Sequence, residues 1–242
     1  MLKLMMKLIP VLAVVLLFFA GCNKESSASG NIYGFISLDD QYGSPVTTGL
    51  SGATVTLNGK TTTTNSSGMY TFNNQTAGEY TISVTQSGYG AINGATFQFT
   101  GGGNLDHDGK LSAIPNFNDS LLAVTGDADT ITLSGTLSGN ETRRTTVAVF
   151  VGNSSSTSST PANYLRDYIV TTNNNSFNTF TLNIPVSDLT DLGFTAGQTV
   201  YFAVYGAATN FASTSDYEDL TTGREWYTAL STTPFTATSI MP

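Results

Sequence analysis

The sequence predicts an all-β protein built from two consecutive β-sandwich domains. Short stretches in which apolar and polar residues alternate recur along most of the chain, which is the period of half-buried strands. The chain is rich in Thr, Ser, Asn and Gly, residues that suit strands and turns better than helices. Its 242 residues allow two ordinary domains, and aromatic residues, at 11%, are numerous enough to build a core in each.

The charge and the rare residue types exclude several classes of function. A net charge of −8 and a pI near 4.3 argue against a nucleic-acid partner, which needs clustered Lys and Arg. One Cys excludes an internal disulfide framework and Cys-rich zinc sites. One His leaves little room for His-based acid–base chemistry or a two-His metal site. We therefore expect no cofactor.

Residues 1–21 have the pattern of an export signal. Lys3 and Lys7 precede an apolar run that is too short to span a membrane. The following Phe19-Ala-Gly-Cys22 resembles a bacterial lipobox, which implies cleavage before Cys22 and attachment of lipid to that residue. The alternative is an ordinary secretory peptide with an incidental Cys.

Residues 22–30 (CNKESSASG) are polar and without periodicity, as expected of a flexible tether. Asn23 is not the Asp that resembles an inner-membrane retention signal, so the lipobox implies an outer-membrane lipoprotein. Whether it faces the periplasm or the cell surface stays open.

Residues 31–114 form the first predicted domain. Asn58-Gly59 is a strong two-residue hairpin signal between two of its strands. Strands are expected at 32–38, 53–57, 61–64, 70–72, 79–84 and 97–99, with 111–114 closing the unit. Short strands with turns at this spacing predict a small antiparallel sandwich.

Several segments of this domain resemble the carboxypeptidase regulatory-like domain. They are 50–55 (LSGATV), 64–72 (TNSSGMYTF), 77–84 (AGEYTISV) and Gly88-Tyr89. The resemblance implies a transthyretin-like sandwich, related in plan to Cna-B-type repeats. It also implies a structural or spacer module without catalysis.

Residues 115–129 are predicted to be a linker, and residues 130–242 a second β-sandwich of immunoglobulin-like or fibronectin-like plan. Residues 199–205 (TVYFAVY) are the strongest core strand, and residues 186–192 are either one helical turn or a corner between sheets. Further strands are expected at 130–137, 147–151, 164–170, 177–184, 226–230 and 235–237.

Few residues are candidates for chemistry. Asp106 and Asp108 resemble the opening of a calcium loop, but the pattern lacks further ligands and equally describes a plain turn. Paired carboxylates for hydrolysis could come from Glu141, Glu218, Asp219 and Glu225, yet acidic residues beside turns are more simply solubilising. We predict no catalytic residue.

A binding site is more plausible near the C-terminus. Tyr217, Arg224, Trp226 and Tyr227 bring aromatic rings and charge into one segment. Such rings can stack on a sugar or anchor a protein partner. The alternative is that Trp226 and Tyr227 alternate on a strand with one of them in the core.

Two short motifs resemble acceptors of bacterial O-glycosylation. These are Asp119-Ser120-Leu121 and Asp129-Thr130-Ile131, with Ser120 and Thr130 as the modified residues. Both lie at the predicted junction between the domains.

Together these features predict a non-enzymatic cell-envelope lipoprotein that acts as an adhesion, scaffold or spacer module. Its partners would be the membrane, through the lipid on Cys22, and an extracellular glycan or envelope protein. The alternative function is capture of polysaccharide by the C-terminal domain.

Overall fold

The computed structural model describes residues 28–139, 141–172, 176–209, 217–219 and 222–242. The predicted signal peptide, Cys22 and most of the tether lie outside these residues. None of the helices in the described ranges has the length and apolar character needed to cross a membrane.

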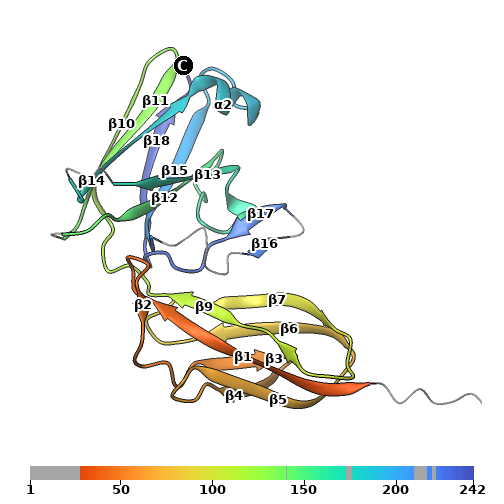
Figure 1. Cartoon of the computed structure of the whole chain (residues 1–242). Helices are drawn as coiled ribbons and strands as arrows, with labels where there is room; N and C mark the ends of the chain where they lie inside the picture. The colour runs from red at the N-terminus through yellow and green to blue at the C-terminus, as the bar shows by residue number, and fades with distance from the viewer. Residues whose placement is uncertain (1–27, 140, 173–175, 210–216, 220–221) are drawn as a thin grey trace, which may run out of the picture.

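The first sandwich consists of two sheets (Figure 1). In one sheet, β1 pairs antiparallel with β2 and β5 and parallel with β8 and β9. The other sheet has the order β4-β3-β6-β7. The bounds are β1 Ser29–Asp39, β2 Pro45–Val46, β3 Thr54–Leu57, β4 Lys60–Thr63, β5 Met69–Thr76, β6 Gly78–Thr85, β7 Ile92–Phe99, β8 Leu105–Asp106 and β9 Gly109–Ser112.

Alternating side chains of these strands form the first core. On β6, Tyr80, Ile82 and Val84 are buried while the residues between them face outward, as predicted. Asn58 and Gly59 both have positive φ and join β3 to β4, which is the hairpin that the dipeptide predicts. The strand pattern of this domain is therefore confirmed, but the expectation of a purely antiparallel sandwich is wrong, because β8 and β9 pair parallel with β1.

The second sandwich also has two sheets. One has the order β10-β11-β14 and the other β13-β12-β15-β18, while β16 and β17 form a separate hairpin. The bounds are β10 Asp119–Gly126, β11 Thr130–Leu137, β12 Thr146–Gly152, η1 Pro161–Asn163, β13 Arg166–Thr171, β14 Thr179–Pro185, α2 Val186–Asp191, β15 Thr199–Ala207, β16 Tyr217–Asp219, β17 Arg224–Trp226 and β18 Phe235–Ile240.

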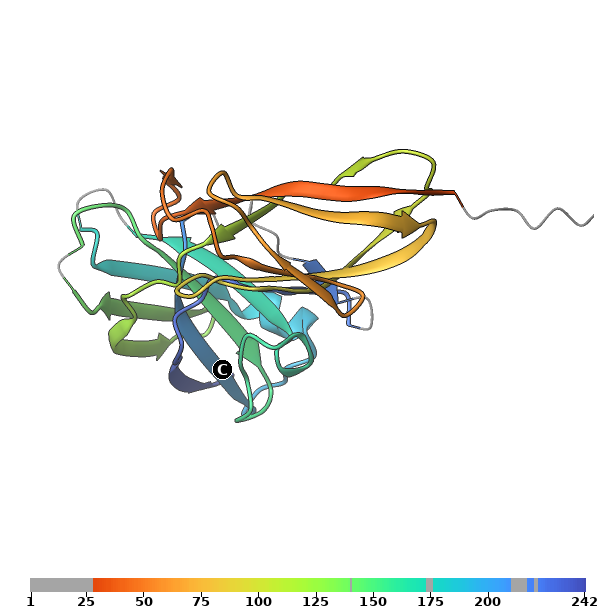
Figure 2. The ribbon, with the colours of Figure 1, turned by 90° about the horizontal axis from the view of Figure 1, so that it is seen from below.

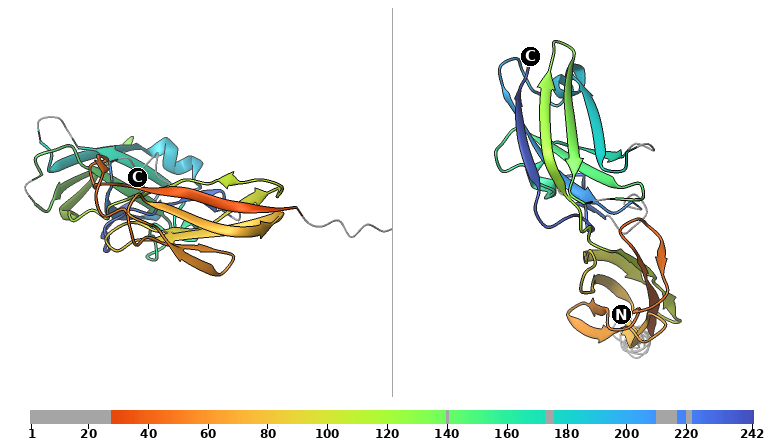
Figure 3. Two further views of the ribbon diagram at one scale, coloured as in Figure 1. Left: turned by 60° about the horizontal axis from the view of Figure 1, so that its bottom comes forward. Right: turned by 90° about the vertical axis from the view of Figure 1, so that its left-hand side faces the viewer.

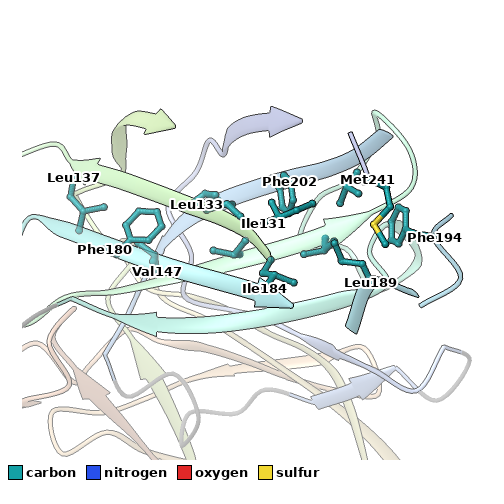
Figure 4. Packing of buried hydrophobic residues seen from close by; sticks show 14 of the residues in the cluster. Ile131, Leu133, Leu137, Val147, Phe180, Ile184, Leu189, Phe194, Phe202 and Met241 are labelled. Atoms are coloured by element: carbon teal, nitrogen blue, oxygen red, sulfur yellow. The ribbon is translucent and has the colours of Figure 1, made fainter. Parts of the chain in front are cut away.

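The core of the second sandwich lies between its two sheets (Figure 4). Ile131 and Leu133 of β11 pack in the same cluster as Phe202 of β15. Every residue of β12 is buried, because layers cover both faces of this strand. The all-β class with two successive sandwiches is confirmed.

The predicted linker differs from the structure. Residues 119–126 form β10, whose residues Leu122 and Val124 pack against the second core. Phe117, before the strand, is 1% exposed and belongs to the same core. The alternation of Leu122 and Val124 is hidden in the sequence because the neighbouring Leu121 is apolar although exposed. The sequence pattern therefore indicates a linker where the second sandwich in fact starts.

The strand β17 and the helical turn α2 lie where the sequence left the structure partly open or differently placed. The strand expected at 226–230 is instead β17, Arg224–Trp226, and only Leu230 beyond it makes an isolated bridge, to Ala207. The chain leaves the ladder after Trp226, which sequence alternation alone does not reveal. Residues 186–191 form the helical turn α2, one of the two predicted alternatives.

The two sandwiches follow one another in space as they do in sequence. Strand β1 spans the length of the first sandwich (Figure 2) and ends on the side that faces the second. The C-terminus lies at the end of the second sandwich that points away from the first (Figure 3).

Candidate functional site

The second sandwich carries an aromatic layer on the outer face of the sheet β13-β12-β15-β18. Phe150 of β12 lies at its centre and is fully buried. The rings of Tyr164, Tyr205 and Tyr227 surround it edge-on, with centroids 5.0, 5.6 and 5.2 Å away. Edge-to-face packing at these distances is favourable, so this layer fixes the segments that supply the rings.

Polar contacts attach β17 to this layer. The Arg224 guanidinium donates to the carbonyl of Pro161 at 2.8 Å and lies 5.7 Å from the centre of the Tyr164 ring. The Tyr164 hydroxyl donates to the carbonyl of Glu225 at 2.8 Å. Burial, and then the charge of Asp167, raise the pKa of Tyr164, so its hydroxyl stays protonated and can donate.

Three of the four predicted binding residues have described side chains, and their environments differ. Tyr227 packs on Phe150 and donates a hydrogen bond to Asp167, and Arg224 is engaged by Pro161 and Tyr164. Trp226 is half-buried on β17, where its backbone pairs with that of Tyr217. The structure brings Arg224, Trp226 and Tyr227 into one hairpin region, and two of these side chains support the fold there.

A groove lies on the same outer face, beside the aromatic layer. Its volume is about 310 Å³, and its lining combines the loop after β12 with β15 and β18. Tyr201, Thr236 and Thr238 line it from the outer face of the sheet, and the loop adds Ser155 and the buried Thr157. Sequence reasoning missed this site. The available signal was the strand parity of Tyr201, which faces away from the core side chains Val200 and Phe202.

The acidic pair of the first sandwich lies where β8 leads into β9, with Asp106 at the end of β8 and Asp108 just before β9. Asp108 accepts a hydrogen bond from the Phe35 amide at 2.7 Å, and His107 stacks on Phe97 with ring centroids 4.1 Å apart. Burial lowers the pKa of His107, whereas desolvation and then the charge of Asp108 raise the pKa of Asp106. In the described parts of the chain, no three His, Cys, Asp or Glu side chains are grouped to hold a metal ion.

The glycosylation candidates lie on strands. Ser120 is exposed near the start of β10, where its hydroxyl donates to the Thr136 carbonyl at 2.8 Å. Thr130 is half-buried at the start of β11. Both stay predictions, as does the lipid on Cys22.

Loops of the two sandwiches meet in a joint, defined here as residues 40–44 of the first and 141–143 of the second. Arg143 forms an ion pair with Asp40 at 3.3 Å and donates to the Ser44 hydroxyl at 2.8 Å. Its guanidinium also lies 4.5 Å from the centre of the Tyr42 ring, and the Tyr42 hydroxyl donates to Glu141. Burial and the bond to Glu141 raise the pKa of Tyr42.

Backbone contacts extend the joint. The Thr209 amide donates to the carbonyl of Gln41 at 3.0 Å, and the Asn116 amide donates to the Gln41 side chain at 2.9 Å. Gly90 approaches Thr228 so closely that a Cβ on this glycine would lie 2.2 Å from the Thr228 carbonyl oxygen. The contact has no room for a side chain.

These features define a two-domain all-β protein with a joint between its sandwiches and a groove on the second. Residues 40–112 match the family model of the carboxypeptidase regulatory-like domain, which confirms the resemblance of the first sandwich. Comparison with curated proteins finds no match to the chain.

Solved structures of several bacterial proteins align with most of the length of this chain. One, from Bacteroides uniformis and provisionally assigned to carbohydrate binding, is 18% identical, with TM-score 0.31, covering 88% of this chain and 99% of that one. A DUF3823 family protein from Bacteroides ovatus is 14% identical, with TM-score 0.33, covering 88% and 100%. Another from Parabacteroides merdae is 13% identical, with TM-score 0.29, covering 85% and 98%.

Proposed function

We propose that the protein is a non-catalytic cell-envelope lipoprotein whose first sandwich is a spacer that holds the second away from the membrane. The observation that carries this proposal is the course of β1, Ser29–Asp39. It starts next to the tether and ends next to the joint (Figure 1). Eleven residues in a strand span about 35 Å. The end of the first sandwich next to the tether is thus separated from the joint by the length of β1.

The joint makes this spacer stiff. Domains in one chain move relative to each other unless specific contacts join them. Here Arg143 is held by a carboxylate, a hydroxyl and an aromatic ring of the first sandwich at once. The connection itself is short and anchored, because Phe117 is buried in the second core.

Two measurements test the anchor and the spacer. Cys22→Ser should release the protein from the outer membrane to the soluble fraction; continued membrane partitioning would show that the lipid is not the anchor. In the Cys22→Ser background, spin labels on cysteines at exposed Glu79 and Asp191 should give a narrow distance distribution by pulsed electron paramagnetic resonance. A broad distribution in the otherwise unchanged protein would contradict a stiff spacer.

The second candidate function is capture of an extracellular glycan by the second sandwich. The observation in its favour is the aromatic layer, which holds the β17 hairpin with Trp226 half-buried at the surface. A rigid aromatic side chain loses little conformational entropy when a ligand packs on it. Trp226 is the only Trp of the chain, so its fluorescence reports on this region directly. Titration with polysaccharides that neither shifts nor quenches the emission would count against contact with Trp226.

A further inference from the structure

We propose that the groove lined by Ser155, Tyr201, Thr236 and Thr238 binds one uncharged sugar unit of a polysaccharide, with its ring on Tyr201. This inference rests on the second candidate function, and it places the contact on a different part of the sandwich from Trp226.

The floor of the groove exists because small residues flank Tyr201. In the antiparallel ladders, Tyr201 lies opposite Gly152 of β12 on one side and Thr238 of β18 on the other. Ala203, the next outward residue of β15, lies opposite Thr236. Opposed side chains on neighbouring strands lie about 5 Å apart, so the short side chain of Thr238 leaves open space on one side of the tyrosine ring. On the other side, Gly152 leaves room for a loop to pack against the sheet.

One wall of the groove is a loop that packs down on Gly152. A Cβ on Gly152 would lie 2.3 Å from the Thr157 hydroxyl oxygen and 3.2 Å from the carbonyl oxygen of Asn163. Only glycine allows this close approach. The loop is thereby brought against the sheet, where Ser155 and Thr157 line the groove.

The same wall is held in shape before any ligand arrives. The Thr157 amide and hydroxyl both donate to the Ser154 carbonyl, at 3.0 and 2.6 Å. Farther along the loop, the Ser159 amide donates to the hydroxyl of Tyr205, a member of the aromatic layer. A wall fixed in this way reduces the ordering cost of binding.

The chemistry of the lining selects the ligand class. The lining residues include no Asp, Glu, Lys, Arg or His, although the chain as a whole carries a net charge of −8. The hydroxyls of Ser155, Tyr201, Thr236 and Thr238 make no hydrogen bond to other residues in the described parts of the chain. Each hydroxyl can both donate and accept, as can the hydroxyls of a sugar.

A pyranose unit matches this arrangement. Its C–H face can pack on the half-buried Tyr201 ring while its equatorial hydroxyls meet the Ser and Thr hydroxyls at the two walls. The volume, about 310 Å³, is at the lower end for small-molecule sites and suits one sugar unit better than a longer segment. The open groove lets the rest of the polymer continue into solvent.

The test uses the mature chain, residues 22–242, with Cys22→Ser to keep it soluble. Isothermal titration calorimetry is run with soluble starch, xyloglucan and mannan, and with polygalacturonic acid as an acidic counterpart. For a neutral polysaccharide that binds, Tyr201→Ala should weaken affinity at least about tenfold, whereas Tyr201→Phe, which keeps the ring, should stay within about threefold. Thr238→Val removes one hydroxyl from the lining while keeping the size of the side chain, and it should weaken binding.

Two matched variants locate the contact. Tyr33→Ala removes a half-buried tyrosine from the first sandwich and should leave binding unchanged. Trp226→Ala removes the alternative aromatic contact and should also leave binding unchanged. Thermal unfolding of each variant confirms that the fold is retained.

The outcomes separate the groove from the function on which it rests. Binding that survives Tyr201→Ala but is lost in Trp226→Ala would overturn the groove and leave glycan capture standing. Binding of polygalacturonic acid alone would overturn the assignment to an uncharged ligand. Failure of the wild-type protein to bind any of these polysaccharides would remove the second candidate function and the groove with it.

Discussion

Asp119 is a buried carboxylate whose removal should stabilise the protein at neutral pH. It is 4% exposed, at the start of β10, and one of its oxygens is buried without a hydrogen-bond partner among the described residues. The other oxygen accepts a bond from the Leu121 amide at 3.3 Å. Asp119→Asn keeps the size of the side chain and an acceptor oxygen but cannot ionise.

The magnitude follows from the pKa. Burial raises the pKa of Asp119 from 3.8 to about 6, against smaller opposing effects of backbone hydrogen bonds. Each pKa unit corresponds to about 1.4 kcal/mol, so the ionised folded state is penalised by at most about 3 kcal/mol. Between pH 4 and 6 the folded protein holds a proton that the unfolded chain has released. The free energy of unfolding that depends on the protonated Asp119 is therefore fully present below pH 4 and is lost as the pH rises through 6.

Urea unfolding of both proteins from pH 4 to 7.5 measures the effect. The difference in free energy of unfolding between Asp119→Asn and wild type should grow by about 1 to 3 kcal/mol across this range, in favour of the variant at high pH. Asp106 and His107 titrate in both proteins, so the difference isolates Asp119. Parallel curves for the two proteins would refute the reasoning, because they would show that Asp119 has the same pKa in the folded and unfolded chains.

Three further substitutions probe the aromatic layer and the joint. Phe150→Ala should cost about 3 to 5 kcal/mol in urea unfolding, because it removes a fully buried ring with three aromatic neighbours, and it should red-shift Trp226 emission as β17 loosens. Arg143→Ala should change the free energy of unfolding by about 1 kcal/mol or less, since its ion pair is half-exposed, yet broaden the distance distribution between the two sandwiches; an unchanged distribution would show that Arg143 does not hold the joint. Gly90→Ala should broaden the same distribution, because its Cβ would collide with the Thr228 carbonyl, and a distribution as narrow as wild type would contradict that contact.

The strands could be predicted from the sequence where one face is buried and the other solvated. On β6 and β11 the buried residues Ile82 and Leu133 follow a strict alternation, and the period fixes both the strand and its inner face. On β10, exposed Leu121 adjoins half-buried Leu122, so neither parity stands out and the sequence pattern indicates a linker instead of a strand.

The candidate site was harder to predict because it depends on contacts between distant segments. Trp226 and Tyr227 are adjacent in sequence, and the expectation that strand alternation separates them fails because β17 ends at Trp226. Tyr227 then reaches Phe150 through a turn, a pairing of residues 77 positions apart that no local pattern encodes. The groove likewise needs Gly152 and Tyr201 to be cross-strand neighbours, which only the register of β12 and β15 establishes.

The chain segment that connects the two sandwiches contacts both of them. These contacts affect how stiff the proposed spacer can be. Asn118 donates to Thr233 and accepts from the Ser231 hydroxyl at 3.1 Å, so the segment between buried Phe117 and buried Asp119 is tied to the second sandwich. Asn116, just before it, binds Gln41 of the first sandwich. Bending at the connection would therefore have to break contacts on both sides within four residues. The stiffness that we propose for the spacer thus rests on the anchored connection as well as on Arg143, and loss of Arg143 alone should loosen the joint without freeing the two sandwiches.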